Sequence, residues 1–330
     1  MNEFVFFLNK GVSAGLIIGS IYALGAVGVT LIFGILRFAH FAHGDMMTLG
    51  AFVTLILATL FATLGIDMGL PIAFIVMFPA MAITALLAIG IDKLFYKPLR
   101  DAGSKGVVLV MASVGVTLML QGLIRLFAGV GSRDMFVEAP KAIYRLPIPG
   151  ASRPLVITEP QLLLIGFTVV AVVALHLFLT RARLGKAMRA VSDNPELARI
   201  TGINTDHVVW ATWIIGGALA CAAGTLLSMD VTLKPDLSFN ILLPIFAATI
   251  VGGIGQPYGA VAGGFLVGFC ETLAVFNWAI LLRPFQGQLW FDLPTNMALV
   301  PTEYKLMVPF LILIVVLIYR PTGMFKGRVL

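Results

Sequence analysis

Apolar runs that are long enough to cross a bilayer dominate this sequence of 330 residues. Crossing ~30 Å of hydrocarbon takes ~20 residues of helix, and runs of about this length lie at 11–36, 162–180 and 208–229. Backbone groups inside lipid must pair within their own segment, and these runs lack the alternating pattern of barrel strands. With 59% hydrophobic and 12% charged residues, the sequence predicts a polytopic, all-α membrane protein with about eight transmembrane helices.

Two segments interrupt the apolar pattern. The other candidate spans are 46–64, 70–91, 106–124 and 306–319. The first interrupted segment is a glycine-rich apolar block at 241–276. Glycines and Pro257 would break a helix in the middle of this block, so it forms either two short re-entrant helices or two spans that meet at a tight turn. A weaker interruption lies at 34–50. Paired interruptions are typical of transporters built from inverted repeats, with the substrate path near the breaks.

The polar segment 181–207 fixes the expected topology. Its five basic residues favour the cytoplasmic side, because positively charged loops are retained there during insertion. Alternation from this anchor places the N-terminus outside, the C-terminus in the cytoplasm, and more than half of the 22 Lys and Arg residues on the cytoplasmic side. The proline-containing stretches 132–161 and 277–305 become external loops. Topology accounts for the net charge of +6, so we expect a lipid bilayer and no nucleic acid as the partner of these charges.

The sequence offers no pattern for catalysis, and we expect no catalytic site, no metal site and no cofactor. Gly185-Lys186 is followed by Ala187 and lacks the upstream glycine of a phosphate-binding loop. Ionisable residues inside spans mark ion-coupled carriers, and the apolar segments contain few of them. Glu271 is the one candidate for a functional charge, with an interhelical hydrogen bond as the alternative, and we interpret His176 as a hydrogen-bonded or snorkelling residue.

Residues 193–202 have the pattern of a short capped helix. Asp193 or Asn194 can cap it, Pro195 suits the first turn, and Gly202 suits the position after the last turn. Before it, apolar residues at 184, 187, 188 and 191 form a stripe on one helix face. A helix of roughly seven residues is far shorter than the ~12–15 needed for stability in water. We therefore expect it to dock on a surface.

The same segment resembles a known motif. Glu196 to Gly202 (ELARITG) is similar to the E-A-A-x-x-x-G coupling motif of ABC importer permeases, with Leu197 in place of the first alanine and without the downstream I-x-L-P. Four stretches extend the likeness over nearly the whole chain, and together they resemble the permease family of branched-chain amino acid ABC importers. These stretches are RFAHFAHGDMMTLGAF at 37–52, GKAMRAVSDNPELARITGIN at 185–204, VGGIGQPYGAVAGG at 251–264 and RPTGMFKGR at 320–328.

The resemblance implies a single transmembrane domain over 1–330 in a bacterial inner membrane. It implies two ABC ATPase subunits below, a second related permease subunit beside the chain, and a periplasmic solute-binding protein above. On the matching positions, coupling to the ATPases would involve Asp193, Pro195, Glu196, Ala198 and Gly202. The translocation path would involve Phe41, His43, Gly44, Gly252, Gly253, Gly255 and Gly259, and we add Glu271 to it as the candidate functional charge.

The small-molecule substrate implied by the resemblance is a branched-chain, hydrophobic amino acid. The two external stretches look longer than the usual loops of this family, and urea, short amides and other small solutes remain alternatives. A different class, an ion-coupled secondary carrier that uses Glu271 and His176, also remains open. So does a membrane scaffold without a transport role.

Overall fold

The protein, described here by a computed structural model, is helical through the membrane region, and the structure covers residues 1–64, 70–136, 140–288 and 294–325. Within these ranges, seven helical stretches are long and apolar enough to cross a membrane. Two apolar helices are shorter, Phe239–Gly252 and Met307–Tyr319. The long stretches are Asn2–Leu36, His43–Ala62, Ile72–Asp101, Gly106–Ala128, Glu159–Arg181, Thr205–Asp230 and Pro257–Val275. The predicted polytopic all-α fold is confirmed.

Most elements begin and end near the boundaries that the apolar runs predict. Two stretches are exceptions. The first starts at Asn2 and not at residue 11, because apolar residues continue the pattern upstream of Lys10, and the third runs on to Asp101 and does not end at residue 91. The elements in chain order are α1 (Asn2–Phe7), η1 (Leu8–Ser13), α2 (Ala14–Leu36), α3 (His43–Ala62), α4 (Ile72–Ile91), η2 (Asp92–Tyr96), α5 (Lys97–Asp101), α6 (Gly106–Ala128), β1 (Ile143–Leu146), β2 (Leu155–Thr158), α7 (Glu159–Arg181), α8 (Arg183–Asp193), α9 (Pro195–Ile200), α10 (Thr205–Asp230), α11 (Phe239–Gly252), α12 (Pro257–Val275), α13 (Ala279–Leu282), η3 (Arg283–Gln288), η4 (Thr302–Tyr304) and α14 (Met307–Tyr319).

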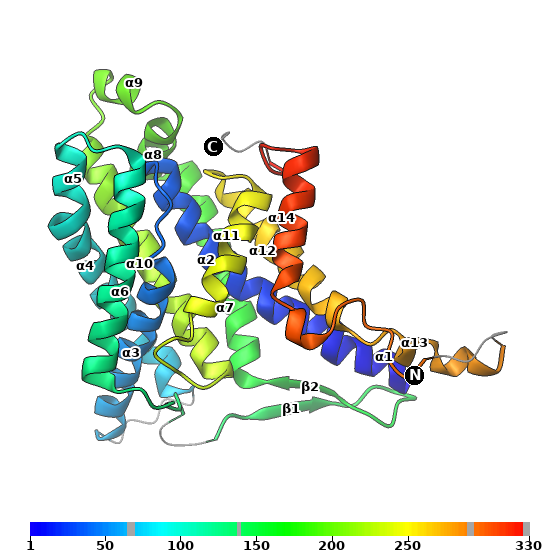
Figure 1. Cartoon of the computed structure of the whole chain (residues 1–330). Helices are drawn as coiled ribbons and strands as arrows, with labels where there is room; N and C mark the ends of the chain where they lie inside the picture. Colours follow the sequence, from blue (N-terminus) through cyan, green and yellow to red (C-terminus); the bar gives the residue numbers. More distant parts are fainter. Residues whose placement is uncertain (65–69, 137–139, 289–293, 326–330) are drawn as a thin grey trace.

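The bundle has two ends that differ in what they carry (Figure 1). Helices α8 and α9 lie at one end, together with α5 and the C-terminal end of α14. The strands β1 and β2 lie at the other end, with α1 and α13. We call these ends the α9 face and the hairpin face.

Helix α2 is the buried centre of the bundle and packs closely against α12. Small residues permit this approach: a Cβ added to Gly264 would lie 2.5 Å from the backbone nitrogen of Ala23, and one added to Gly268 would lie 2.5 Å from that of Gly19. Bulky residues complete the seam, since the ring of Phe265 lies over Gly19. Small residues at helix interfaces let backbones meet and gain dispersion energy, which drives helix association in membranes.

The glycine-rich block forms two helices joined by a tight turn, and of the two the second, Pro257–Val275, is long enough to cross a membrane. Helix α11 runs to Gly252, and α12 begins at Pro257. The turn lies near the α9 face, where Gly255 donates its backbone N–H to Thr30 Oγ1 at 2.9 Å. Helix α11 has 14 residues, about 21 Å of length, so it is shorter than the hydrocarbon core.

The proline-containing stretch 132–161 contains a β-hairpin, an element that the sequence pattern does not predict. Strands β1 and β2 pair antiparallel, with Ile143 opposite Thr158. Two asparagines tie the hairpin to the first helical stretch. Asn2 exchanges two hydrogen bonds with Ser152, and Asn9 accepts from the N–H of Val156 at 2.9 Å. The expectation of an ordered loop is therefore confirmed for its described residues.

The other proline-containing stretch, 277–305, contains the short helical elements α13, η3 and η4. Trp278 begins it on the hairpin face, where its ring lies 6.1 Å from that of Phe7. Residues 289–293 of this stretch and residues 326–330 of the C-terminal motif lie outside the described ranges.

Candidate functional site

Helices α8 and α9 form the candidate coupling element. Helix α8 follows α7 after a break at Ala182 and buries Met188 and Val191, two members of the predicted stripe, while Leu184 stays partly exposed. Helix α9 has six residues, close to the seven expected. Asn194 is its cap, because the side-chain oxygen accepts hydrogen bonds from the N–H groups of Glu196 and Leu197, each at 3.1 Å. Of the two capping residues considered, Asn194 therefore has the role, and Asp193 ends α8.

Helix α9 ends just before the glycine that the sequence predicts, Gly202. Gly202 has φ +85, a left-handed conformation that only glycine adopts without a cost. The N–H of Ile203 then returns to the carbonyl of Ala198 at 3.0 Å, which is a Schellman-type closure. Ala198 is buried, whereas Leu197 and Ile200 are 58% and 83% exposed. The helix thus presents two large apolar side chains to its surroundings, next to the exposed carboxylate of Glu196.

A non-helical segment at 37–42 separates α2 from α3. It starts at Arg37, which has φ 60 and whose Nη2 donates to the carbonyl of Ser192 at 2.8 Å. Near its other end, the N–H of Phe41 donates to Ser113 Oγ at 3.2 Å. The segment therefore joins α2 to α3 and is hydrogen-bonded to the end of α8 and to α6. It corresponds to the interruption predicted at 34–50.

An apolar pocket of about 290 Å³ lies between the two interrupted segments. Phe41 from the first segment and Ile254 from the glycine-rich turn both line it. Phe246 of α11 adds a ring whose centroid is 4.9 Å from that of Phe41. Helix α14 contributes Phe310. The breaks in the two halves of the sequence thus meet at one pocket, and that pocket suits an apolar side chain.

His43 and Gly44 lie next to Phe41 in the sequence but face other parts of the protein. The His43 imidazole is fully buried against α2, where a Cβ on Gly28 would lie 2.5 Å from the ring. Gly44 packs against Ser238 and Leu242. Of these predicted path residues, only Phe41 lines the described pocket.

A buried aromatic cluster stands behind this segment. The ring of His40 lies 5.0 Å from that of Trp213 and 5.4 Å from that of Tyr96, and the Tyr96 and Trp213 rings are stacked. The cluster joins η2 and α10 to the 37–42 segment. The sequence pattern does not predict this cluster, because its three residues are far apart in the chain.

The predicted glycines lie in and around the α11–α12 turn, where they allow close backbone contact. Gly252 and Gly259 face each other, and a Cβ on either would come within 2.2 Å of the other's carbonyl oxygen. Gly253 and Gly255 have positive φ values of 109 and 82. The C-terminal segment closes over the turn, since Met324 donates its N–H to the carbonyl of Val251 at 2.9 Å.

Glu271 is paired at the opposite end of α12. Its Oε1 lies 3.1 Å from the Nζ of Lys305, and its Oε2 accepts the hydroxyl hydrogen of Tyr22 at 2.7 Å. The carboxylate is 2% exposed. The interhelical bond considered as the alternative is thus present, and Lys305 and Tyr22 are partners that the sequence does not reveal.

His176 lies far from Glu271. Its Nδ1 is 2.9 Å from the hydroxyl of Tyr258, at the start of α12. Tyr258 and Glu271 are separated by about 20 Å along the helix axis. His176 of α7 therefore contacts one end of α12, and Glu271 lies near the other end.

An all-helical membrane domain in which two broken segments meet at an apolar pocket has the architecture of a transport permease. Residues 11–317 match the profile of the family described as "Branched-chain amino acid transport system / permease component". The chain belongs to this family.

Individual relatives agree with this membership. The chain is 32% identical over 337 residues to the high-affinity branched-chain amino acid transport system permease protein BraD of Pseudomonas aeruginosa, covering 99% of this chain and 98% of the relative. It is 32% identical over 329 residues to the corresponding LivH of Escherichia coli, covering 99% and 97%. A probable LivH of Methanocaldococcus jannaschii is 30% identical over 264 residues, 79% of each chain. No solved structure matches the chain significantly.

Proposed function

We propose that the chain is one of two permease subunits of an ATP-driven importer in a bacterial inner membrane, and that the importer carries branched-chain amino acids. The observation that supports coupling to separate ATPase subunits is the structure of helix α9. Its six residues are too few for a stable isolated helix, yet a cap and a glycine closure hold it in place. Leu197 and Ile200 project from it as apolar contacts for a separate ATPase subunit.

The coupling residues have distinct roles in this proposal. Asp193 ends α8, Pro195 starts α9, and Ala198 anchors α9 to the protein through its buried methyl group. Glu196 is the exposed charge that faces the ATPase, and Gly202 fixes the exit of the chain. Movement of this element reaches the 37–42 segment through the hydrogen bond from Arg37 to Ser192.

The substrate proposal rests on the relatives and on the pocket. BraD and LivH are named as branched-chain amino acid permeases, and Phe41, Phe246 and Leu243 line a pocket that is almost entirely apolar. Such a wall favours an aliphatic side chain over urea or a short amide, because a polar solute would lose hydrogen bonds with water and gain few in return. The glycines of the α11–α12 turn let α11 and α12 meet close to this pocket. A periplasmic solute-binding protein would deliver the substrate.

In the proposed topology the α9 face is cytoplasmic and the hairpin face is external. The C-terminus is then cytoplasmic and the N-terminus external. This orientation follows the concentration of Lys and Arg residues around the α9 face. Single cysteines at Ser104 and at Ser152 test it. A membrane-impermeant maleimide added to intact spheroplasts should label Ser152→Cys and leave Ser104→Cys unlabelled, and the reverse pattern would refute the orientation.

Reconstitution into liposomes tests the function. The chain with its partner permease, ATPases and binding protein should take up leucine only when ATP is inside the vesicles, and excess isoleucine or valine should compete while urea and acetamide should not. Uptake by the chain alone, driven by a proton or sodium gradient, would refute the ABC importer and favour the secondary carrier. If the purified chain has no effect on any ATPase, it is a scaffold.

Variants of α9 test the coupling role separately. Glu196→Lys and Gly202→Leu should leave insertion intact but uncouple or dissociate the ATPases, and Glu303→Lys makes the same charge change on the hairpin face as a control. Wild-type transport with both α9 variants would refute the assignment.

A further inference from the structure

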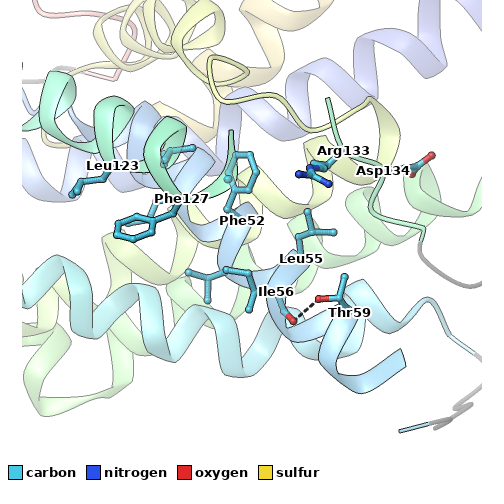
Figure 2. A pocket seen from close by; sticks show the side chains of 12 residues that line it. Phe52, Leu55, Ile56, Thr59, Leu123, Phe127, Arg133 and Asp134 are labelled. Carbon is cyan, nitrogen blue, oxygen red and sulfur yellow. Dashed lines mark hydrogen bonds between the residues drawn. The ribbon is translucent and has the colours of Figure 1, made fainter. Parts of the chain in front are cut away.

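A large apolar groove lies between α3 and α6, in the half of the membrane that adjoins the hairpin face (Figure 2). Its volume is about 680 Å³, more than twice that of the pocket at Phe41. Phe52, Leu55 and Ile56 of α3 form one wall, and Leu123 and Phe127 of α6 form the other. Ile56 and Phe127 are 64% and 83% exposed. The groove therefore opens sideways, toward the region that lipid occupies around a membrane protein.

The length of the groove matches one leaflet. Along α3 it extends from Leu49 to Thr59, which is about 15 Å at 1.5 Å per residue. The hydrocarbon core of a bilayer is ~30 Å thick, so one leaflet contributes about the same 15 Å. An extended acyl chain that enters from the hairpin face would end near Leu49.

A basic side chain stands at the hairpin-face end of the groove. Arg133 is fixed there by two backbone hydrogen bonds with Leu233, at 2.8 and 2.9 Å. In Figure 2 its guanidinium points toward Leu55, whereas the carboxylate of Asp134 points away. Asp134 Oδ1 instead accepts the N–H of Phe136 at 3.1 Å. Among the described residues, no hydrogen bond or ion pair engages the Arg133 guanidinium.

We propose that this groove binds an anionic phospholipid, with one acyl chain between α3 and α6 and the headgroup phosphate on Arg133. The combination of one cation with a leaflet-long apolar wall selects this ligand. A free phosphate would gain nothing from the apolar wall. A branched-chain amino acid would fill only a small part of the length. Arginine binds phosphate oxygens through paired N–H groups, and anionic lipids attract basic residues at the membrane surface.

Photo-crosslinking tests the site. The full-length chain, purified in its native complex, is placed in phosphatidylcholine nanodiscs that contain phosphatidylglycerol with a diazirine on its acyl chain. Irradiation followed by peptide mapping should label residues 49–59 and 123–128 more strongly than the exposed face of α7. Arg133→Gln should reduce this labelling about fivefold, the effect of one basic residue at an anionic membrane surface. Arg145→Gln, an exposed arginine of the hairpin, should leave it unchanged.

A second lipid probe and a second variant distinguish binding of an anionic lipid from other causes of labelling. A phosphatidylcholine probe with the same chains should label the groove more weakly than the phosphatidylglycerol probe, and Arg133→Gln should reduce the difference between the two probes. Ile56→Trp, which fills the groove, should reduce labelling by the phosphatidylglycerol probe. Labelling that spreads evenly over all lipid-facing helices would overturn the proposal. So would competition by millimolar leucine, which would indicate a substrate site, or a crosslink at Ile56 to another protein subunit, which would indicate an interface.

Discussion

The Nζ of Lys305 lies 3.1 Å from Oε1 of Glu271, so a residue of the 277–305 stretch forms an ion pair with the buried end of α12. The carboxylate also accepts from Tyr22 of α2. The pair thus joins α2, α12 and the external stretch at the hairpin face. A buried charge is tolerated only when it is paired and hydrogen-bonded, which accounts for the two partners.

Removing one member of this pair should destabilise the protein. We expect Lys305→Met to lower stability by roughly 1–3 kcal/mol, less than the loss at a fully buried pair because the ammonium is partly exposed. Glu271→Gln should cost less, since the amide can still accept from Tyr22. The double variant should be more stable than Lys305→Met alone. Thermal unfolding in detergent measures all three, and additive effects would contradict an interaction between the two residues.

The cap of α9 provides a second prediction. Asn194→Ala should cost about 1 kcal/mol of helix stability and should weaken association with the ATPase subunits, because α9 has little else to hold it. Asn204→Ala is a matched control, since Asn204 caps α10 through the N–H groups of Asp206 and His207 and α10 is held by packing along its length. Co-purification of the ATPases measures the difference. Equal losses in the two variants would show that the cap of α9 has no special role.

The seam between α2 and α12 should not accept a methyl group. Gly268→Ala would put a Cβ against the backbone of Gly19, and we expect a loss of about 3 kcal/mol or more, the upper range for overpacking. Gly166→Ala in α7 is the control, because nothing lies within 4 Å of the added atom and alanine favours a helix by ~1 kcal/mol. Size-exclusion chromatography after heating compares them. A Gly268→Ala protein as stable as the wild type would show that the helices can separate.

The asparagine ties should protect the hairpin from proteolysis. Asn9→Ala removes the bonds to Val156 and Pro154, so trypsin should cleave the chain faster after Arg145. Cleavage after Arg181, at the opposite face, is the internal control and should not change. Mass spectrometry of a digestion time course gives the rates, and an unchanged rate at Arg145 would show that the hairpin is held by other contacts.

The sequence predicts the membrane helices well because hydrocarbon thickness sets their length and composition. It also predicts the cap and the terminator of α9, since Asn194 and Gly202 act on their immediate neighbours. The break before α3 and the turn before α12 are visible for the same reason: glycine, proline and polar residues act locally on the backbone.

The remaining features depend on residues that meet only after folding. Lys305 and Tyr22 give no local signal of their contact with Glu271. The groove beside Arg133 arises from how α3 and α6 diverge, which neither helix encodes alone. The distinction between Phe41, which lines the pocket, and His43, which packs on Gly28, depends on how the 37–42 segment leaves α2. Helical periodicity does not extend across such a break.

The close contact of α2 with α12 also limits how the protein can change shape. Helices that touch through their backbones cannot rotate or slide past each other without a clash, whereas helices separated by side chains can shift by small steps. These two helices therefore behave as one rigid body during any conformational cycle. The hinges must lie elsewhere, and the non-helical segment between Arg37 and Phe41 is placed where such a hinge would connect α8 to the rest of the bundle.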